Sequence, residues 1–464
     1  MEITNAQIQE WLNSGDSKEY FDLLKFATVG ADVNHLRDCV QCATWLKKWL
    51  KGIGAEAELI LPSGGDASSS VPVVFAEIKG EEGASTVLFY GHYDVQPADP
   101  EDLWETPPFE PSLRDGRVYC RGSQDDKGQF FAFLCGVRQY LAAAGEKVNL
   151  KILLEGQEES GSTGLFKLLA EPSFRKRLAG DVMLVCDTSA AADLRPSIMA
   201  GIRGVNHFTV KLTAAQRDLH SGEYGGVAPN AAQGMCELLS SLHAPDGSIA
   251  VAGFLDGKEV PSPAELEMAS AAFPSEDAAR EAFEKDTGVP PCGGERAKPV
   301  FLRTGFEPTI EINGVHSGYG GAGSKTVIPC EAIAKISTRL VPGQNPRRTF
   351  EAIKEHLIAH CPEGMEVSFP EDSGLSAALK LPLSSPLFAI AEEVLSQMDS
   401  RGPLFQWGGA SIPVVSALKE TSGAAALLVG WGQADDRIHS PNESFSVRQF
   451  FLAKEWAMRI LERL

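Results

Sequence analysis

Two residues, His92 and Asp94, stand two positions apart directly after the apolar run 87–90. In a strand, residues i and i+2 point to the same face, so the imidazole and the carboxylate would leave the strand together. A histidine that binds a metal usually donates its second ring N–H to a carboxylate or a carbonyl, and Asp94 could accept it. An isolated pair of this kind is more often only a polar strand end. Metal binding therefore requires further ligands elsewhere in the chain.

Other residues of ligand type recur beside later apolar or helical patterns. They are Asp125 ahead of a helical pattern, Glu158 and Glu159 after the run 150–154, Asp187 after 182–186, and His439 after 425–431. Taken singly, an aspartate at a helix start is usually an N-cap and a glutamate pair usually lies on the surface. Gathered together, acidic groups repel one another unless cations lie among them. Two histidines and three carboxylates suit zinc or a similar divalent ion.

The elements that must position these residues are short buried strands. The runs 87–90, 150–154 and 182–186 are continuous in apolar residues, and 130–144 between them has a helical pattern. Continuous runs are typical of parallel strands covered on both faces. We therefore predict an α/β fold with a mostly parallel sheet, to which 425–431 adds a strand. Because open sheets of this kind bind ligands at the carboxyl ends of their strands, the ligand-type residues are expected to converge there.

The middle of the chain has a different pattern. Alternating strands such as 207–212, a helical stretch at 230–242 and a strand and helix region at 309–360 predict an inserted two-layer α+β domain. The stretch 263–287 is rich in Ala and Glu at helical spacing and predicts a solvated helical excursion. The predicted boundaries give a main domain built from 1–198 and 382–464, with the inserted domain over 199–381.

Composition and charge exclude several classes of function. The 464 residues are 43% hydrophobic and 22% charged, and 62 acidic against 42 basic residues give a formal net charge of −20. Nucleic acid is not an expected partner, since phosphate binding needs clustered Lys and Arg. No stretch resembles a secretory signal or reaches the length of a membrane span, so no membrane partner is expected. Nine scattered cysteines indicate reduced thiols and a cytoplasmic location.

Several runs of residues resemble the motifs of the M20 metallopeptidases. They are GHYDVQP at 91–97, WETPPF at 104–109, RGSQDDKG at 121–128 and EGQEESGS at 155–162, followed by DLHSG at 218–222, KTVIP at 325–329 and SIPV at 411–414. The likeness runs in order over nearly the whole chain. Within the family it is strongest to the carnosinase-like, or cytosolic nonspecific, dipeptidase branch. The resemblance implies a di-zinc peptidase domain with an inserted lid and dimerisation domain.

The resemblance also implies two divalent metal ions per subunit, with Zn²⁺ expected first and Mn²⁺ or Co²⁺ as alternatives. Asp125 would bridge the two ions. One ion would be held in addition by His92 and Asp187, and the other by Glu159 and His439.

Catalytic roles follow from the same resemblance. Asp94 would hold His92 in place, and Glu158 would be the general base for a water activated by the two metals. Because neighbouring side chains of an extended segment point to different sides, Glu159 would bind metal while Glu158 stays free. The family likeness also implies a cis peptide bond between Asp125 and Asp126.

A second set of site residues is expected outside the predicted metal ligands, with His220, Thr326 and Arg339 in the inserted domain and Ser411 in the main domain. The resemblance casts His220 as a donor to the tetrahedral oxyanion, reaching the active site of the partner subunit in a homodimer. Thr326 and Arg339 would hold the carboxylate of a short peptide substrate, and Ser411 is counted among the substrate-binding residues. Arginine suits that task because its planar fork matches a carboxylate.

The expected function is metal-dependent hydrolysis of the peptide bond in dipeptides or short peptides. One rival is an N-acyl amino acid deacylase or desuccinylase, which would use the same centre on a different amide. A rival from another class is a catalytically retired binding or scaffold protein, which would have no need of Glu158 or His220. Two departures from the branch, WGGAS at 407–411 and SSP at 384–386, lie near the expected substrate pocket. A preference for histidine-containing dipeptides therefore does not follow from the resemblance.

Overall fold

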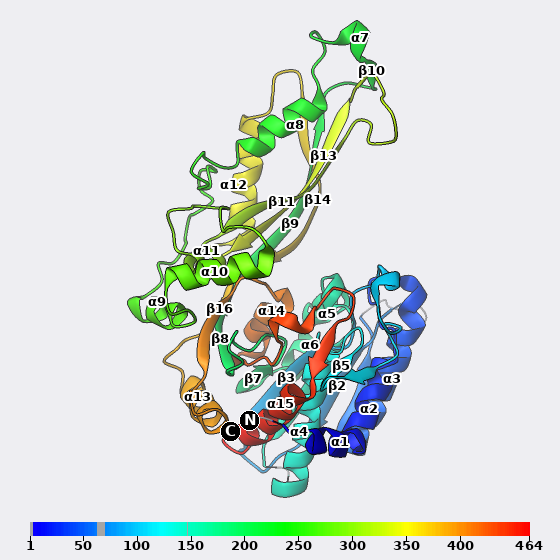
Figure 1. Cartoon of the computed structure of the whole chain (residues 1–464), viewed down its shortest axis with the longest axis vertical. Helices are drawn as coiled ribbons and strands as arrows, with labels where there is room; N and C mark the ends of the chain where they lie inside the picture. The colour runs from blue at the N-terminus through cyan, green and yellow to red at the C-terminus, as the bar shows by residue number, and fades with distance from the viewer. Residues whose placement is uncertain (1–2, 63–69, 146) are drawn as a thin grey trace. The chain divides into compact units, whose positions relative to one another are not determined.

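The chain divides into two compact units in a computed structural model that describes residues 3–62, 70–145 and 147–464 (Figure 1). Unit 1 comprises Met1–Ala200, Leu381–Gln406 and Ala417–Leu464, and unit 2 comprises Gly201–Lys380 and Trp407–Ser416. The sequence-based boundaries left 407–416 in the main domain, whereas the structure includes this segment in unit 2. Hydrogen bonds explain the difference, because Arg203 Nε donates to the Gly409 carbonyl at 2.8 Å.

The sheet of unit 1 has four parallel strands at its centre. Along the sheet these are β6 (Asn149–Glu155), β3 (Thr86–His92), β7 (Val182–Val185) and β17 (Ala425–Leu428). Antiparallel strands flank them: β1 (Glu56–Ile60) and β2 (Val73–Ile78) next to β6, and β8 (Ser197–Ile202) next to β17. Two further strands, β15 (Leu379–Lys380) and β16 (Leu404–Gly408), pair with β8. The predicted α/β class with a mostly parallel sheet is confirmed, because the continuous apolar runs form the buried central strands.

Helices cover this sheet. Those lying within unit 1 are α1 (Asn5–Leu12), α2 (Gly15–Leu24), α3 (Leu36–Gly52), α4 (Lys127–Ala144), α5 (Thr163–Leu169), α6 (Pro172–Arg177), α13 (Pro386–Met398) and α15 (Val447–Leu461). Helix α14 (Pro413–Ser422) begins in unit 2 and ends in unit 1. A small sheet of β4 (Ser112–Arg114), β5 (Arg117–Tyr119) and β18 (Ser444–Ser446) completes the unit. Among the described residues, no helix has the length and apolarity needed to cross a membrane.

Helix α4 is buried along most of its length and packs directly on β3. The rings of Phe89 and Phe133 stack with centroids 4.0 Å apart. The start of the helix comes close to the strand because position 91 is glycine. A Cβ on Gly91 would lie 2.8 Å from Phe130 Cβ and 3.0 Å from Asp126 Oδ2. This close approach brings the start of α4 beside the end of β3.

The strand register decides which residues share an edge of the sheet. His92 is the last residue of β3 and pairs with Glu155, the last residue of β6. Strand β7 ends at Val185, two residues before Asp187. Parallel strands present their carboxyl ends at one edge, so the ligand-type residues that follow them meet there.

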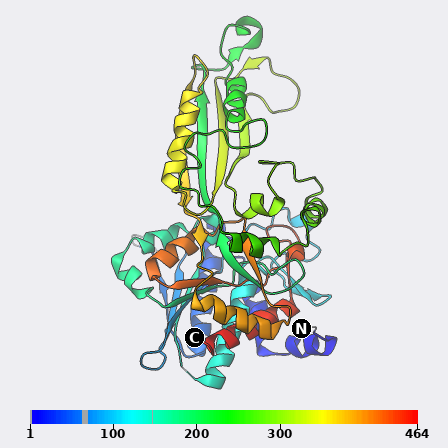
Figure 2. The ribbon, with the colours of Figure 1, turned by 90° about the vertical axis from the view of Figure 1, so that its left-hand side faces the viewer.

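Unit 2 is built on an antiparallel sheet in the order β11 (Thr309–Ser317), β13 (Glu331–Leu340), β9 (Gly204–Thr213) and β14 (Glu366–Ser376). Helices α8 (Ala231–Ser240) and α12 (Pro346–Ala359) pack on it, and Figure 2 shows α12, in yellow, running alongside the strands. Alternate residues such as Phe208, Val210 and Leu212 enter the core between sheet and helices. This is the two-layer α+β arrangement that the alternating pattern predicts.

Shorter elements complete unit 2. These are α9 (Pro263–Ser270) and α10 (Glu276–Thr287) within the predicted helical excursion, α11 (Val300–Gly305), the paired strands β10 (Leu219–His220) and β12 (Val327–Ile328), and α7 (Ser221–Tyr224).

Candidate metal centre

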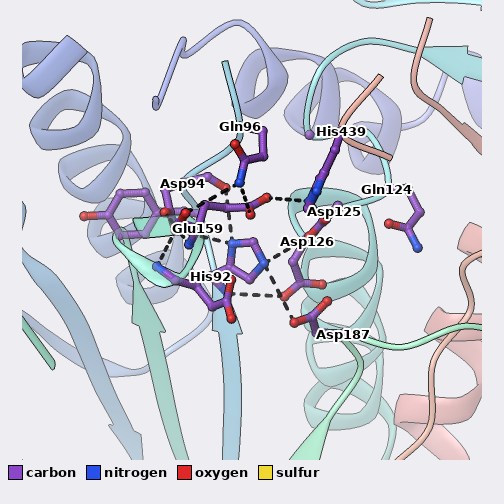
Figure 3. Close-up of polar contacts among 12 residues, drawn as sticks. His92, Asp94, Gln96, Gln124, Asp125, Asp126, Glu159, Asp187 and His439 are labelled. Atoms are coloured by element: carbon purple, nitrogen blue, oxygen red, sulfur yellow. Dashed lines mark hydrogen bonds and ion pairs between the residues drawn. The ribbon is translucent and has the colours of Figure 1, made fainter. Parts of the chain in front are cut away.

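His92 lies at the centre of a buried polar cluster in unit 1 (Figure 3). Its Nδ1 atom lies 3.3 Å from Asp94 Oδ1 and 3.2 Å from the Asp94 carbonyl oxygen. Its Nε2 atom lies on the other side of the ring, 3.1 Å from Asp125 Oδ1 and 3.9 Å from Asp187 Oδ2. One ring nitrogen therefore faces a positioning carboxylate, and the other faces the two carboxylates nominated as ligands.

Asp94 also organises the glutamate pair. Its two carboxylate oxygens accept the backbone N–H groups of Glu158 at 3.1 Å and Glu159 at 3.0 Å. The prediction that this pair belongs to an extended segment was wrong, because Glu158–Ser160 forms a 3₁₀ turn. Two successive N–H groups directed at one carboxylate require a turn. The two side chains still diverge, because successive residues of a 3₁₀ turn are about 120° apart.

Asp125 lies between the two histidines. Its Oδ2 atom is 2.9 Å from His439 Nε2, while its Oδ1 atom faces His92. His439 Nε2 is also 3.2 Å from Glu159 Oε1. The other oxygen of Glu159 accepts a hydrogen bond from Gln96 Nε2 at 2.8 Å. The peptide bond between Asp125 and Asp126 is cis, as the family likeness implied.

The structure brings all five nominated ligands together in two groups that share Asp125. One group is His92, Asp125 and Asp187, and the other is Asp125, Glu159 and His439; within each group the ligand atoms lie within 4.8 Å of one another. Glu159 Oε1 is buried and has no hydrogen-bond partner among the described residues, although His439 is near. An unsatisfied buried carboxylate oxygen is costly. Together with the imidazole and carboxylate donors, it fits a pair of divalent cations.

Electrostatics at the cluster favour cations. Burial opposes a charge on His92, but hydrogen bonds to Asp125 and Asp94 outweigh it and raise the pKa of His92. The nearby carboxylates of Asp125 and then Glu159 raise the pKa of His439 to about 10. Burial raises the pKa of Asp187 to about 7, with the charge of Asp125 adding to the effect. The carboxylates thus stabilise positive charge on the imidazoles between them.

Glu158 belongs to neither group. Burial, followed by the charges of Asp187 and Glu159, raises its pKa well above the usual value for glutamate, against an opposing effect of His92. Its backbone is held by Asp94 while its carboxylate stays outside both sets of ligands. A buried carboxylate with a raised pKa that belongs to neither group is suited to exchanging a proton with a neighbouring water molecule.

A neighbouring buried carboxylate provides a test of these electrostatics. Burial, with the charge of Asp94, raises the pKa of Glu155 from 4.5 to about 8. The folded protein therefore keeps a proton at Glu155 that the unfolded chain loses, and stability falls as the pH rises from about 4.5 to 8. Glu155→Gln keeps an acceptor for Tyr90 and Ser162, which bond Glu155 Oε1 at 2.8 and 3.0 Å.

We expect Glu155→Gln to gain stability over the wild type as the pH rises from 5 to 8, by at most about 1.4 kcal/mol per pH unit, and then to level off. Urea unfolding of chelator-treated protein at each pH measures the difference. A difference that does not change with pH would contradict the assignment.

The four remaining nominated residues, Ser411 among them, lie in two places within unit 2. His220 is exposed and is the cross-strand partner of Val327 in the β10–β12 pair. The Ser221 N–H donates to the Thr326 carbonyl at 3.1 Å. Arg339 lies near the other end of β13, where its Nη1 donates to Ser411 Oγ at 2.8 Å. The structure thus pairs His220 with Thr326 and Arg339 with Ser411. It does not bring Thr326 and Arg339 together, because most of the ten-residue strand β13, which is roughly 30 Å long, lies between them.

The surroundings of Arg339 are cationic. Burial and the charge of Arg339 lower the pKa of Arg203 to about 10, and burial with the charge of Arg339 lowers the pKa of His207. Arg203 is held by the carbonyl oxygens of Gly409 and Glu307 at 2.8 and 3.1 Å. Two guanidinium groups close together suit an anionic ligand.

Sequence reasoning missed two residues that support the cluster. Gln96 lies inside a quoted motif, and its contact with Glu159 was not foreseen. Glu443 follows His439 by four residues, and its buried carboxylate bonds the backbone N–H of Asp125 at 3.1 Å. The only signal for either was proximity in sequence to a nominated ligand.

Comparison with known proteins adds independent evidence. The model of peptidase family M20/M25/M40 matches residues 88–463. The Cys-Gly metallodipeptidase dug1 of Schizosaccharomyces pombe is 27% identical, over 91% of this chain and 90% of that protein. The Beta-Ala-His dipeptidase of Rattus norvegicus is 27% identical, over 86% and 82%. The solved M20 family metallo-carboxypeptidase of Sulfolobus solfataricus has a TM-score of 0.84 at 25% identity, covering 97% of this chain and 99% of that one.

These matches confirm the family and the dipeptidase branch predicted from the motifs. The matched residues include every member of the two ligand groups. The two units and the buried cluster at the strand ends thus belong to a chain that resembles known peptidases over nearly its full length. This protein belongs to peptidase family M20/M25/M40 and is a hydrolase of peptide bonds.

Proposed function

We propose that this protein is a metal-dependent dipeptidase, which hydrolyses the peptide bond of dipeptides or short peptides with two bound divalent cations. The observation that carries the proposal is Asp125, whose two carboxylate oxygens face His92 at 3.1 Å and His439 at 2.9 Å. A single carboxylate shared by two ligand groups is suited to bridging two cations. The similar relatives named as dipeptidases support the choice of substrate.

His92, Asp125 and Asp187 would hold one cation, and Asp125, Glu159 and His439 the other. The donor set suits Zn²⁺, with Mn²⁺ or Co²⁺ as alternatives. When bound, such cations polarise a carbonyl group and acidify a water molecule. Asp94 keeps the Nε2 atom of His92 directed at the first group by holding the ring from its Nδ1 side.

Glu158 is the proposed general base. Its carboxylate takes a proton from the attacking water and then delivers that proton to the leaving amine. Support comes from its place outside both ligand groups and from the hydrogen bond between its backbone N–H and Asp94. Because the same carboxylate of Asp94 positions His92, the base and the ligand are oriented by one group.

His220 is proposed to stabilise the oxyanion of the tetrahedral intermediate. Its Nδ1 atom accepts a hydrogen bond from the Gly222 N–H at 3.0 Å. A neutral imidazole that accepts at Nδ1 carries its proton on Nε2, so the exposed Nε2 is a donor. Arg339, with Ser411 beside it, is proposed to hold the carboxylate of the substrate.

We further propose that the active enzyme is a homodimer in which His220 and Thr326 serve the partner's site. Arg339 lies near one end of β13 and Thr326 lies beyond the other end, and a strand roughly 30 Å long is too long for both residues to touch one dipeptide from the same chain. Strand β11 lies at an edge of the unit 2 sheet and exposes Ile312 and Val315. An exposed edge strand with apolar side chains is a common surface for association.

Mixing two inactive variants tests the assignment of His220 to the partner's site. In a heterodimer of His220→Ala with Glu158→Gln, one site has an intact Glu158 from its own chain and an intact His220 from the partner. An equal mixture that exchanges subunits freely is expected to recover about a quarter of wild-type activity, because half of the dimers are mixed and each has one competent site. Steady-state rates of dipeptide hydrolysis before and after subunit exchange measure the recovered activity.

If His220 served its own chain, both sites of the mixed dimer would lack one residue and the mixture would stay inactive. A mixture of His220→Ala with Arg339→Ala is the matched control. Arg339 is proposed to serve its own chain, so this pair should recover activity in the same proportion.

A substrate panel separates dipeptidase activity from its rivals. Free dipeptides, N-acyl amino acids and N-succinyl amino acids are incubated with metal-loaded protein, and products are identified by mass spectrometry. We expect cleavage of free dipeptides at rates well above those of the acylated compounds. Cleavage of acylated compounds alone would favour the deacylase, and full metal occupancy without turnover of any amide would favour a binding or scaffold protein. The SSP and WGGAS segments give no reason to expect a preference for histidine.

A further inference from the structure

A buried carboxylate outside the two ligand groups, that of Glu443, connects the chain segments that carry Asp125 and His439. Its Oε2 atom accepts hydrogen bonds from Arg121 Nη1 at 2.8 Å and the Gly122 N–H at 2.9 Å. Its Oε1 atom accepts the N–H groups of Gln124 at 2.9 Å and Asp125 at 3.1 Å. Glu443 and Arg121 are each only 1% exposed. Four donors fill the acceptor sites of one carboxylate.

The segment that carries His439 needs such support. The His439 side chain is 50% exposed, so packing restrains it little. Its backbone, with that of Arg437 and Asn442, has φ of 59°, 57° and 63° respectively. Most residues other than glycine and asparagine are disfavoured in this left-handed region, so Arg437 and His439 persist there only when the surroundings hold them.

Anchors hold this segment at both ends. Asp436 accepts hydrogen bonds from the Gln433 N–H at 2.6 Å and from the guanidinium of Arg117. Asn442 accepts the Glu105 N–H at 2.9 Å and donates to the Leu103 carbonyl at 2.9 Å. Glu443 differs from both because it bonds the backbone of a residue shared by the two ligand groups.

We propose that Glu443 is a positioning residue for the cation held by Asp125, Glu159 and His439. It ties the backbone of Asp125 to the segment that carries His439, and so holds the carboxylate and the imidazole at the separation seen here, 2.9 Å. The inference rests on the proposed binding of metal. Glu443 contacts neither substrate nor cation, and it acts through Asp125 and His439.

The charge of Glu443 matters as well as its shape. Glu443→Gln replaces one oxygen by an amide nitrogen, which cannot accept hydrogen bonds from the backbone N–H groups. It also leaves the buried guanidinium of Arg121 without its 2.8 Å ionic partner. Glu443→Asp keeps the charge and both oxygens but shortens the side chain, so it should restore part of the function.

The test measures metal binding rather than turnover. Apo protein is titrated with Zn²⁺ against a chromophoric chelator, and the absorption of Co²⁺ reports the geometry of each site. We expect Glu443→Gln to bind one of the two ions about 10- to 100-fold more weakly and to change the Co²⁺ spectrum. Glu443→Asp should lie between that variant and the wild type.

Asp16→Asn is the matched control. Asp16 pairs with Arg138 and Lys454, each at 2.6 Å, within unit 1 and outside the ligand groups. The Asp16→Asn substitution should lower Tm without weakening the binding of either ion. If Glu443→Gln does not fold, Glu443→Asp and Arg121→Lys provide the same comparison.

Three outcomes would overturn the inference. Wild-type affinities for both ions in folded Glu443→Gln would do so while leaving the proposed function intact. An equal loss of affinity in Asp16→Asn would show that general destabilisation is the cause. A wild-type protein that binds no divalent ion would overturn the proposed function and this inference together.

Discussion

Glu158→Gln is expected to lower kcat by about 10²- to 10⁴-fold, the usual contribution of a general base, while the bound metal is unchanged. Glutamine has the same shape as glutamate but cannot take a proton from water. The side chain of Glu158 belongs to neither ligand group, and only its backbone N–H bonds Asp94. The substitution should therefore remove the proton transfer without disturbing the residues that hold the cations.

Two measurements on the same sample decide the result. Steady-state kinetics on a dipeptide give kcat and KM, and elemental analysis gives the metal content. Glu155→Gln is the matched control, because it removes another buried carboxylate of the same segment and should keep its activity. Near wild-type kcat in Glu158→Gln would remove Glu158 from the role of base. A parallel loss of metal would show that it acts as a ligand.

Asp125→Ala is expected to abolish the binding of both cations and to reduce activity at least about 10³-fold, since metal ions contribute several kcal/mol to transition-state stabilisation. Asp125 is the only residue common to the two ligand groups found among the described residues. Each of its oxygens faces a different histidine, so one substitution removes a ligand from both groups.

Asp187→Asn is the matched comparison for this second prediction. Asp187 belongs only to the group that contains His92. This variant should therefore bind one ion more weakly and bind the other ion as the wild type does. Titration of each metal-free variant with Zn²⁺ measures how many ions that variant binds. Retention of two ions by Asp125→Ala would rule out a bridging role for Asp125.

Much of unit 1 could be predicted because its signals are local. The runs 87–90, 150–154 and 182–186 are continuous in apolar residues, and each forms a central buried strand. The ends of parallel strands meet at one edge, so the residues after them could be placed near one another from the sequence pattern alone. Five candidate ligands were predicted to converge at this edge, and the structure brings their side chains together.

The conformation of the glutamate pair could not be predicted from its neighbours in sequence. The glutamate pair was expected in an extended segment, yet Glu158–Ser160 is a 3₁₀ turn. The cause is Asp94, more than sixty residues earlier, whose carboxylate accepts two successive N–H groups. A hydrogen bond of that sequence separation leaves no periodic pattern in either segment.

Long-range contacts also decided the membership of the two units. The segment 407–416 contacts Arg203 and Arg339 of unit 2, which its own composition does not indicate. In the same way, the resemblance gave Thr326 and Arg339 one shared task, but no local pattern indicated that strand β13 lies between them within one chain.

By itself, the sequence determined the α/β class, the peptidase family and the kinds of side chain available for binding cations. These depend on side-chain chemistry and on hydrophobic periodicity, which are properties of short segments. Only the tertiary structure decided that Asp94 accepts the backbone N–H groups of the glutamate pair, that Gln96 bonds Glu159, and that Glu443 bonds the backbone of Asp125. Those relations arise where segments far apart in the chain meet, because buried carboxylates must find donors wherever the fold provides them.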